Sequence, residues 1–189
     1  MNNRPDRPMT CRGAPVRTQR GMSLIVVLLF LVILTMLGLS ASLTSLSGER
    51  MARNSRDQNI ALQAAEAALR DARTDISMTR ALSGRTGASD TCDVANFKGF
   101  CIPATSGQPV WERYIEDGAR SVTLGEMTQQ AALTAGNVSK QPRYIIESLP
   151  DIADGSLRAG STRYVFRVTA IGYGANPNTK VMVQEVVRF

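Results

Sequence analysis

The 189-residue sequence contains no histidine, few aromatic residues and only three cysteines. Without histidine the chain cannot build a Ser–His or Cys–His pair, the arrangement that most often activates a nucleophile at neutral pH. Metal sites made of imidazole nitrogens are excluded for the same reason. We therefore expect a protein that is not an enzyme and that holds no metal and no cofactor.

Two further absences define the N-terminal part of the chain. No charged residue occurs in residues 22–48, and no proline occurs between Pro15 and Pro103. An α-helix rises about 1.5 Å per residue, so as one helix this stretch would extend about 40 Å. The hydrocarbon core of a bilayer is only about 30 Å thick. Residues 22–48 are therefore predicted to span a membrane.

The residues before this stretch are strongly basic. Residues 1–21 contain one acidic residue and five arginines, namely Asp6 against Arg4, Arg7, Arg12, Arg17 and Arg20. By the positive-inside rule this leader stays in the cytoplasm and the remainder is exported. Five of the 22 basic residues and one of the 16 acidic ones lie in the leader, which leaves a net charge of +2 for the rest. Its arginines are scattered rather than clustered with aromatic residues, so we expect no direct binding of nucleic acid.

Three kinds of N-terminal segment share this layout: a cleaved secretory signal, a plain membrane anchor and a prepilin signal. A secretory signal has a shorter apolar region that ends in an A-x-A pattern, which is missing here. A plain anchor does not explain the glycine at the boundary, Gly21. The segment Arg20-Gly21-Met22-Ser23-Leu24-Ile25 resembles the processing motif of type IV pilins. The resemblance implies that a prepilin peptidase cuts after Gly21 and methylates Met22, while the apolar helix stays attached.

One position departs from the pattern of most type IV pilins. These proteins carry a glutamate at the fifth residue of the mature chain, and the corresponding residue here is Val26. In that family the glutamate pairs with the terminal amine of the subunit added before, which offsets the cost of burying both charges. In lacking this glutamate, the sequence resembles minor pilins and pseudopilins of the PilX and K types. It implies a place at the tip, where no earlier subunit offers an amine.

Beyond residue 48 the helix is expected to continue and to become amphipathic. Apolar residues at spacings of three and four build one stripe, and charged residues, Asp71 among them, lie largely off it. The stripe consists of Leu62, Ala65, Leu69, Ala72 and Ile76. Its alanine-rich part, 63–69, resembles the corresponding segment of PilX-like minor pilins. The helix is expected to end near Gly84, before an irregular region, 84–141, with some helix within 112–135, where residues 126–135 are rich in alanine and glutamine.

The last third of the chain is predicted to be β-sheet. Residues 143–147 form a short candidate strand, and residues 162–173 and 180–189 alternate apolar and polar side chains around a turn cluster at 174–179. Two such runs predict an antiparallel hairpin whose apolar face covers the helical stripe. The expected fold class is α+β and pilin-like. A long helix, with a transmembrane half at 22–48 and an amphipathic half at 49–83, packs on a C-terminal antiparallel β-sheet at 142–189.

The three cysteines divide between the two sides of the membrane. Cys11 lies in the leader and would be removed with it. Cys92 and Cys101 lie in the exported part, where oxidising conditions favour pairing. We expect these two to form a disulfide that stabilises the fold by about 2–3 kcal/mol in the chain-entropy model.

The resemblance as a whole implies a PilX-type minor pilin that helps to prime assembly of a type IV pilus and sits in or near its tip complex. The implied partners are other minor pilins, an adhesin at the tip, the major pilin, the prepilin peptidase and the inner-membrane assembly platform. The precursor is expected in the inner membrane with a periplasmic C-terminal domain, and the assembled subunit at the cell surface. Two alternatives stay open: a K-type pseudopilin of type II secretion and a membrane-anchored periplasmic binding protein that never polymerises.

Overall fold

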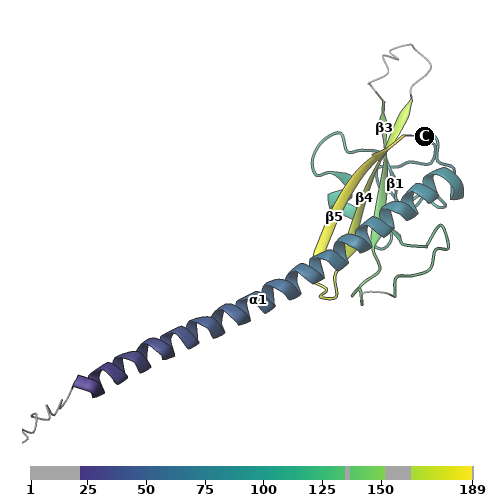
Figure 1. Ribbon diagram of the computed structural model, residues 1–189. Coiled ribbons are helices and arrows are strands. Elements are labelled where there is room, and N and C mark those ends of the chain that lie inside the picture. Colours follow the sequence, from purple (N-terminus) through teal and green to yellow (C-terminus); the bar gives the residue numbers. More distant parts are fainter. Residues whose placement is uncertain (1–21, 135–136, 152–162, 189) are drawn as a thin grey trace, which may run out of the picture. The chain divides into compact units, whose positions relative to one another are not determined.

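The computed structural model describes residues 22–134, 137–151 and 163–188, with the backbone alone at 42–46. The leader, with Gly21 and Cys11, lies outside the described residues. The chain divides into two compact units, Met1–Glu49 and Arg50–Phe189. Helix α1, Met22–Thr74, contributes residues to both units, and the sheet belongs entirely to the second (Figure 1). The pilin-like α+β fold expected from the sequence is thereby confirmed.

The sheet of the second unit is built around a C-terminal antiparallel core. Its strands are β1 (Phe100–Cys101), β2 (Val122–Thr123), β3 (Arg143–Pro150), β4 (Tyr164–Tyr173) and β5 (Lys180–Val187). The order is β1-β3-β4-β5, and β2 also pairs with β3. The predicted hairpin is confirmed, since β4 and β5 pair in antiparallel register and a hydrogen bond from the Gly174 amide to the Thr179 carbonyl, 2.9 Å long, closes their turn. β1, however, runs parallel to β3, so the sheet is mixed rather than purely antiparallel.

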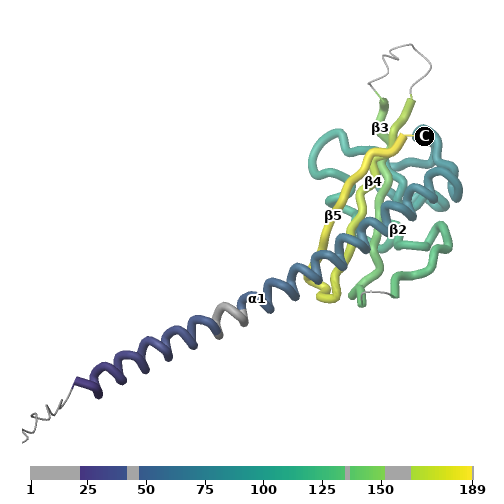
Figure 2. Tube along the Cα trace, viewed as in Figure 1, coloured from purple at the N-terminus to yellow at the C-terminus, as the bar shows by residue number. Residues whose placement is uncertain are grey.

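Within the second unit, α1 crosses one face of the sheet, and Figures 1 and 2 show β3, β4 and β5 side by side beneath it. The helix makes this contact mainly through alanines. Ala61, Ala64, Ala65, Ala68 and Ala72 are each at most 2% exposed. Of these, Ala68 and Ala72 pack with Ile76 in a core that includes Phe100, Tyr144, Ile146, Phe166 and Val168.

The small size of these helical side chains follows from a close approach of backbones. A Cβ atom at Gly172 of β4 would overlap the backbone of Ala61 and Ala65. Helix and strand therefore lie closer together than a leucine between them would allow. This corrects the predicted stripe in part: Ala65, Ala72 and Ile76 are buried, whereas Leu62 is 37% exposed and Leu69 is only partly buried.

Helix α1 ends earlier than the expected boundary near Gly84. After Thr74 the backbone forms a π-helical segment, Asp75–Thr79, which ends where the Arg80 amide donates to the Asp75 carbonyl at 2.9 Å. The hydroxyl of Thr74 donates to the Arg70 carbonyl, and that of Ser77 donates to the Arg73 carbonyl. Such side-chain bonds slightly destabilise and bend a helix, which is consistent with the change to π-helical backbone at this point.

The segment 84–141 is more ordered than the sequence analysis expected. Besides β1 and β2 it contains the short helix α2, Val110–Tyr114. The helix expected within 112–135 is found only at the start of that range, since α2 includes residues 112–114, whereas residues 124–128 form turns and the described residues 126–134 contain no helix. Gly125 and Gln129 both take positive φ angles there, which breaks a right-handed helix.

We predict that Gly172→Ala will lower the free energy of unfolding of the purified chain in detergent by about 3 kcal/mol or more. The added methyl group would force the helix and the sheet apart, and overpacking of this kind costs about 1–3 kcal/mol even where neighbours can adjust. The measurement is thermal or urea unfolding followed by circular dichroism. Gly48→Ala is the matched control, because a Cβ at Gly48 meets nothing within 4 Å. Equal stability of the two variants would contradict the close contact.

Candidate functional site

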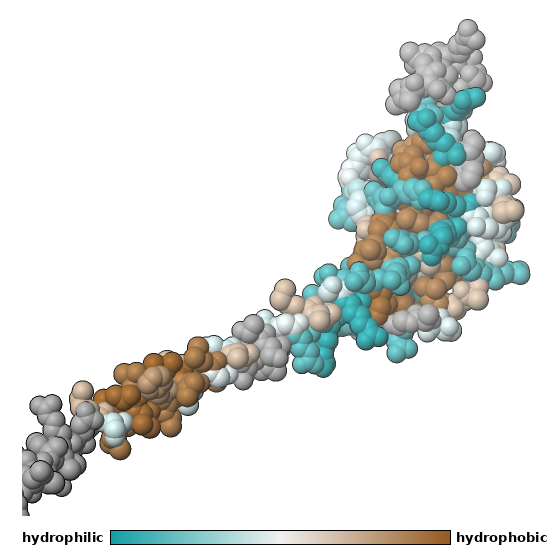
Figure 3. All heavy atoms as spheres, viewed as in Figure 1, coloured by the Kyte–Doolittle hydropathy of each residue, from teal (hydrophilic) through white to brown (hydrophobic). Residues whose placement is uncertain are grey.

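The first candidate site is the apolar surface of α1 in the first unit. Residues Met22–Ala41 have a mean hydropathy of 2.9, and none of this span is buried. In Figure 3 the visible side of this segment is almost uniformly hydrophobic. A helix that is apolar all round is stable only when lipid or other protein surrounds it. By length and composition, this is a helix that can cross a membrane.

The few polar groups of this segment are compatible with an apolar environment. The Thr35 hydroxyl donates to the Val32 carbonyl at 2.8 Å, so it is satisfied within the helix itself. Gly38, Ser40 and Ala41 are exposed and small. Small residues on an apolar helix allow the backbone of a second helix to approach closely.

The residues predicted for processing fall at the start of α1. Met22 is the first helical residue and is 74% exposed, and Val26 follows one turn later at 48% exposed. The first turn of α1 contains no acidic residue. Within that turn, therefore, no carboxylate compensates the positive end of the helix macrodipole. Gly21 itself lies outside the described residues.

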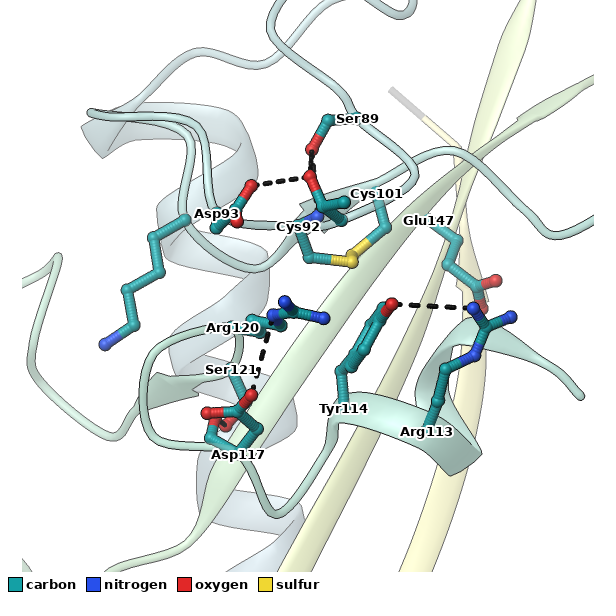
Figure 4. The surroundings of a disulfide bond; sticks show 12 residues. Ser89, Cys92, Asp93, Cys101, Arg113, Tyr114, Asp117, Arg120, Ser121 and Glu147 are labelled. Carbon is teal, nitrogen blue, oxygen red and sulfur yellow. Dashed lines mark hydrogen bonds and ion pairs between the residues drawn. A yellow bond between two sulfur atoms is a disulfide. The ribbon is translucent and has the colours of Figure 1, made fainter.

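The second candidate site is the loop closed by the disulfide between Cys92 and Cys101, which the structure contains (Figure 4). Both cysteines are fully buried. The Gly99 amide donates to the Cys92 carbonyl at 2.8 Å, and the Ile146 amide of β3 donates to the Gly99 carbonyl at 2.8 Å. These contacts fasten the loop to the sheet. Residues 93–96 at its tip are exposed, and a loop presented on such a rigid base is suited to partner recognition.

A second layer beside this loop covers the face of the sheet opposite α1. It contains the buried side chains of Cys92, Cys101, Val110, Ile115, Ile145, Ile171 and Tyr173. On its surface the guanidinium groups of Arg113 and Arg120 lie 5.2 and 4.4 Å from the ring centre of Tyr114. Arg120 also pairs with Asp117 at 3.6 Å (Figure 4). Arginine and tyrosine are enriched at the centres of protein interfaces, so this cluster is a candidate contact surface.

Two buried aspartates, Asp71 of α1 and Asp75 of the π-helical segment that follows it, fasten loops to the helix, and the sequence analysis missed both. Asp71 was expected to lie off the buried stripe, but it is fully buried. Its carboxylate accepts hydrogen bonds from the Gly125 amide, at 2.8 Å, and from the Thr128 hydroxyl. The carboxylate thereby pins the 125–128 turn to the helix, which is why burial is tolerated.

Asp75 lies one turn further along and is also fully buried. Its carboxylate accepts from the Arg80 Nε at 2.7 Å and from the Tyr144 hydroxyl at 2.8 Å. Arg80 additionally donates to the Lys98 carbonyl at 2.8 Å. Burial, and secondarily the charge of Asp75, raises the pKa of Tyr144, so this hydroxyl stays a donor. The network joins the end of α1 to β3 and to the disulfide-closed loop.

The sequence did contain a signal for this network. Asp71 and Asp75 are four residues apart, on either side of the buried Ala72, and hence occupy one side of the helix. What the sequence could not supply is the identity of their partners, which lie 5–69 positions away. Among the described residues there is no group of three or more His, Cys, Asp or Glu side chains that could hold a metal ion.

Comparison with family models matches both ends of the chain. Residues 20–70 match a model described as PilX N-terminal, and residues 86–189 match one described as Type IV pilus assembly protein PilX C-term. The second match alone covers more than half of the sequence. No curated protein and no solved structure matches the chain significantly.

We predict that Asp75→Asn will destabilise the chain by about 3–5 kcal/mol, because it leaves the buried guanidinium of Arg80 without its counter-charge. Urea unfolding of the purified chain in detergent, followed by the fluorescence of Trp111, measures the change. Asp93→Asn is the control: Asp93 is exposed, and surface substitutions usually change stability by less than about 0.5 kcal/mol. A loss for Asp75→Asn no larger than that of the control would show that the network contributes little.

Proposed function

Because the chain belongs to the PilX family of type IV pilus assembly proteins, we propose that it is a minor pilin that primes assembly from the tip complex of the fibre. The observation that carries the tip placement is Val26, at the position where most pilins have a glutamate. The charge-free stretch 22–48 offers no other carboxylate that could pair with the terminal amine of an earlier subunit. A subunit that starts the fibre has no such amine to meet.

The proposed life of the protein begins in the inner membrane. The basic leader remains in the cytoplasm, α1 crosses the bilayer and the second unit lies in the periplasm. The prepilin peptidase then cuts after Gly21 and methylates the new terminus at Met22. This order is supported by the Arg20-Gly21-Met22 boundary in the sequence and by the apolar span that begins at Met22.

Assembly exchanges one apolar environment for another. As the platform lifts the subunit, lipid contacts of residues 22–41 are replaced by the helices of neighbouring subunits, including other minor pilins and the major pilin. The exposed small residues Gly38, Ser40 and Ala41 support this, since they permit close packing of helices. The apolar surface is thus covered both before and after assembly.

The second unit is proposed to contact neighbours in the tip complex and an adhesin above it. The rigid disulfide-closed loop with its exposed 93–96 tip, and the cluster of Arg113, Tyr114 and Arg120, are the surfaces that support this role. We propose no catalytic activity and no cofactor for the chain. It has no histidine, and its two exported cysteines share a disulfide.

We predict that Gly21→Val will block processing and leave a precursor about 2 kDa heavier than the mature protein, at about 110 Da for each residue of the leader that charge retains in the cytoplasm. Intact mass spectrometry measures this and also detects the methyl group on Met22. Gly13→Val is the control, because this glycine lies within the leader and away from the boundary.

The mass also separates the alternatives. A plain anchor would give an unprocessed wild-type chain, and a secretory signal would give a cut beyond the apolar span. If Gly21→Val is still shortened to Met22, the prepilin interpretation fails.

We predict that deleting the gene will sharply reduce the number of surface pili while the major pilin is still made and processed. Val26→Glu is expected to be neutral to harmful for piliation, because an unpaired carboxylate near the membrane centre costs about 2.5–3.5 kcal/mol and less near the interface. Electron microscopy and immunoblots of sheared pili measure both effects.

Val27→Glu is the matched control for this substitution. It places the same charge one residue away from the family's glutamate position. Should Val26→Glu alone increase incorporation along the shaft, and deletion leave pilus number unchanged, the subunit belongs to the shaft and the tip placement is wrong.

A further inference from the structure

Three arginines open the second unit. Arg50, Arg53 and Arg56 are all exposed, and their spacing of three places them along one side of α1. The first of them comes two residues after the charge-free stretch ends at Gly48. A long arginine side chain near the end of a membrane-spanning stretch can extend its charged head to the lipid headgroups.

Two of these arginines border a hollow of about 430 Å³ in the second unit. Arg53, Asn54 and Arg56 form the α1 side, while Asn176 and Thr179 of the β4–β5 turn form the opposite side. The walls are rich in N–H donors. A guanidinium group presents a planar fork of such donors, which matches two oxygens of a phosphate group.

The carboxylate in this hollow, Asp57, is already engaged. It accepts hydrogen bonds from the Ala175 amide at 2.6 Å and from the Asn176 amide at 3.2 Å. A hydrogen bond from Thr179, more than these two, lowers the pKa of Asp57. A Cβ at Gly174 would overlap the Asp57 side chain, so this glycine is needed for the close approach. Asp57 thus fixes the turn against α1 and gives the hollow a defined wall.

On this basis we propose that Arg53 and Arg56, with the β4–β5 turn, bind the headgroup of an anionic phospholipid at the membrane surface. The inference rests on the proposed function, in which residues 22–48 cross the bilayer. Lipid is the occupant because Arg53, the first arginine of the hollow, follows the end of the charge-free stretch at Gly48 by only five residues, about 7.5 Å along a helix. An anionic headgroup is preferred to a zwitterionic one because it carries no cation that the two arginines would repel.

The test uses the full mature chain in detergent and native mass spectrometry with phosphatidylglycerol and phosphatidylcholine of identical acyl chains. Each arginine near an anionic surface strengthens binding about fivefold, so Arg53→Gln with Arg56→Gln should reduce the preference for phosphatidylglycerol by roughly 25-fold. Arg70→Gln with Arg85→Gln is the control, since it removes the same charge from exposed positions elsewhere in the unit. Arg53→Lys with Arg56→Lys should retain most of the preference, because the charge remains.

Four outcomes overturn the proposal: no preference in the wild-type chain, the same preference in the Arg53→Gln with Arg56→Gln variant, an equal loss in the control pair, or displacement of the lipid by an equal concentration of inorganic phosphate. Circular dichroism verifies that each variant is folded, and the single variants Arg53→Gln and Arg56→Gln, each expected to lose part of the preference, test the site if the pair is not. Processing and piliation are measured separately. A chain that is cut at Gly21 and primes pili but shows no lipid preference loses this inference alone, whereas an uncut chain with the preference loses the proposed function.

Discussion

The close contact between α1 and β4 at Gly172 is the constraint on which the second unit depends. It admits only small helical side chains, and each buried alanine contributes less hydrophobic stabilisation than a leucine would. The helix is fastened instead by polar contacts along α1 and the π-helical segment that follows it. Asp57 holds the β4–β5 turn, Asp71 holds the 125–128 turn and Asp75 holds Arg80 and Tyr144. The buried alanines let the helix and the sheet approach closely, and the three aspartates fix which loops pack against the helix.

The elements that the sequence predicted well are those encoded locally. The charge-free helix, the hairpin around residues 174–179 and the pairing of Cys92 with Cys101 follow from composition, alternation and compartment, and each needs only neighbouring residues or a single partner. The parallel strand β1 and the burial of Asp71 were missed because each depends on a partner far along the chain. β1 pairs with β3, and the Asp71 carboxylate accepts a hydrogen bond from the Gly125 amide. Periodicity places side chains on one side of a helix but does not identify what packs there.

The two units follow opposite rules about charge. Residues 22–48 contain no charged residue, and the family match shows that the chain is a type IV pilus assembly protein of the PilX family. In the second unit, charged side chains are often structural, as in the buried Glu147, whose carboxylate receives two bonds of 2.9 Å from Arg167. A substitution that is harmless in one unit, such as a new carboxylate on a surface, is therefore costly in the other.

The complete burial of Cys92 and Cys101 imposes an order of events on maturation. An oxidising enzyme reaches a thiol only while it is accessible, so the bond must form before the layer that contains Val110 and Ile115 closes over it. Once closed, that layer shields the bond from reductants. The disulfide of the finished domain therefore shows that the domain folded in an oxidising compartment. A chain that folded elsewhere would keep two thiols that no oxidant could later reach.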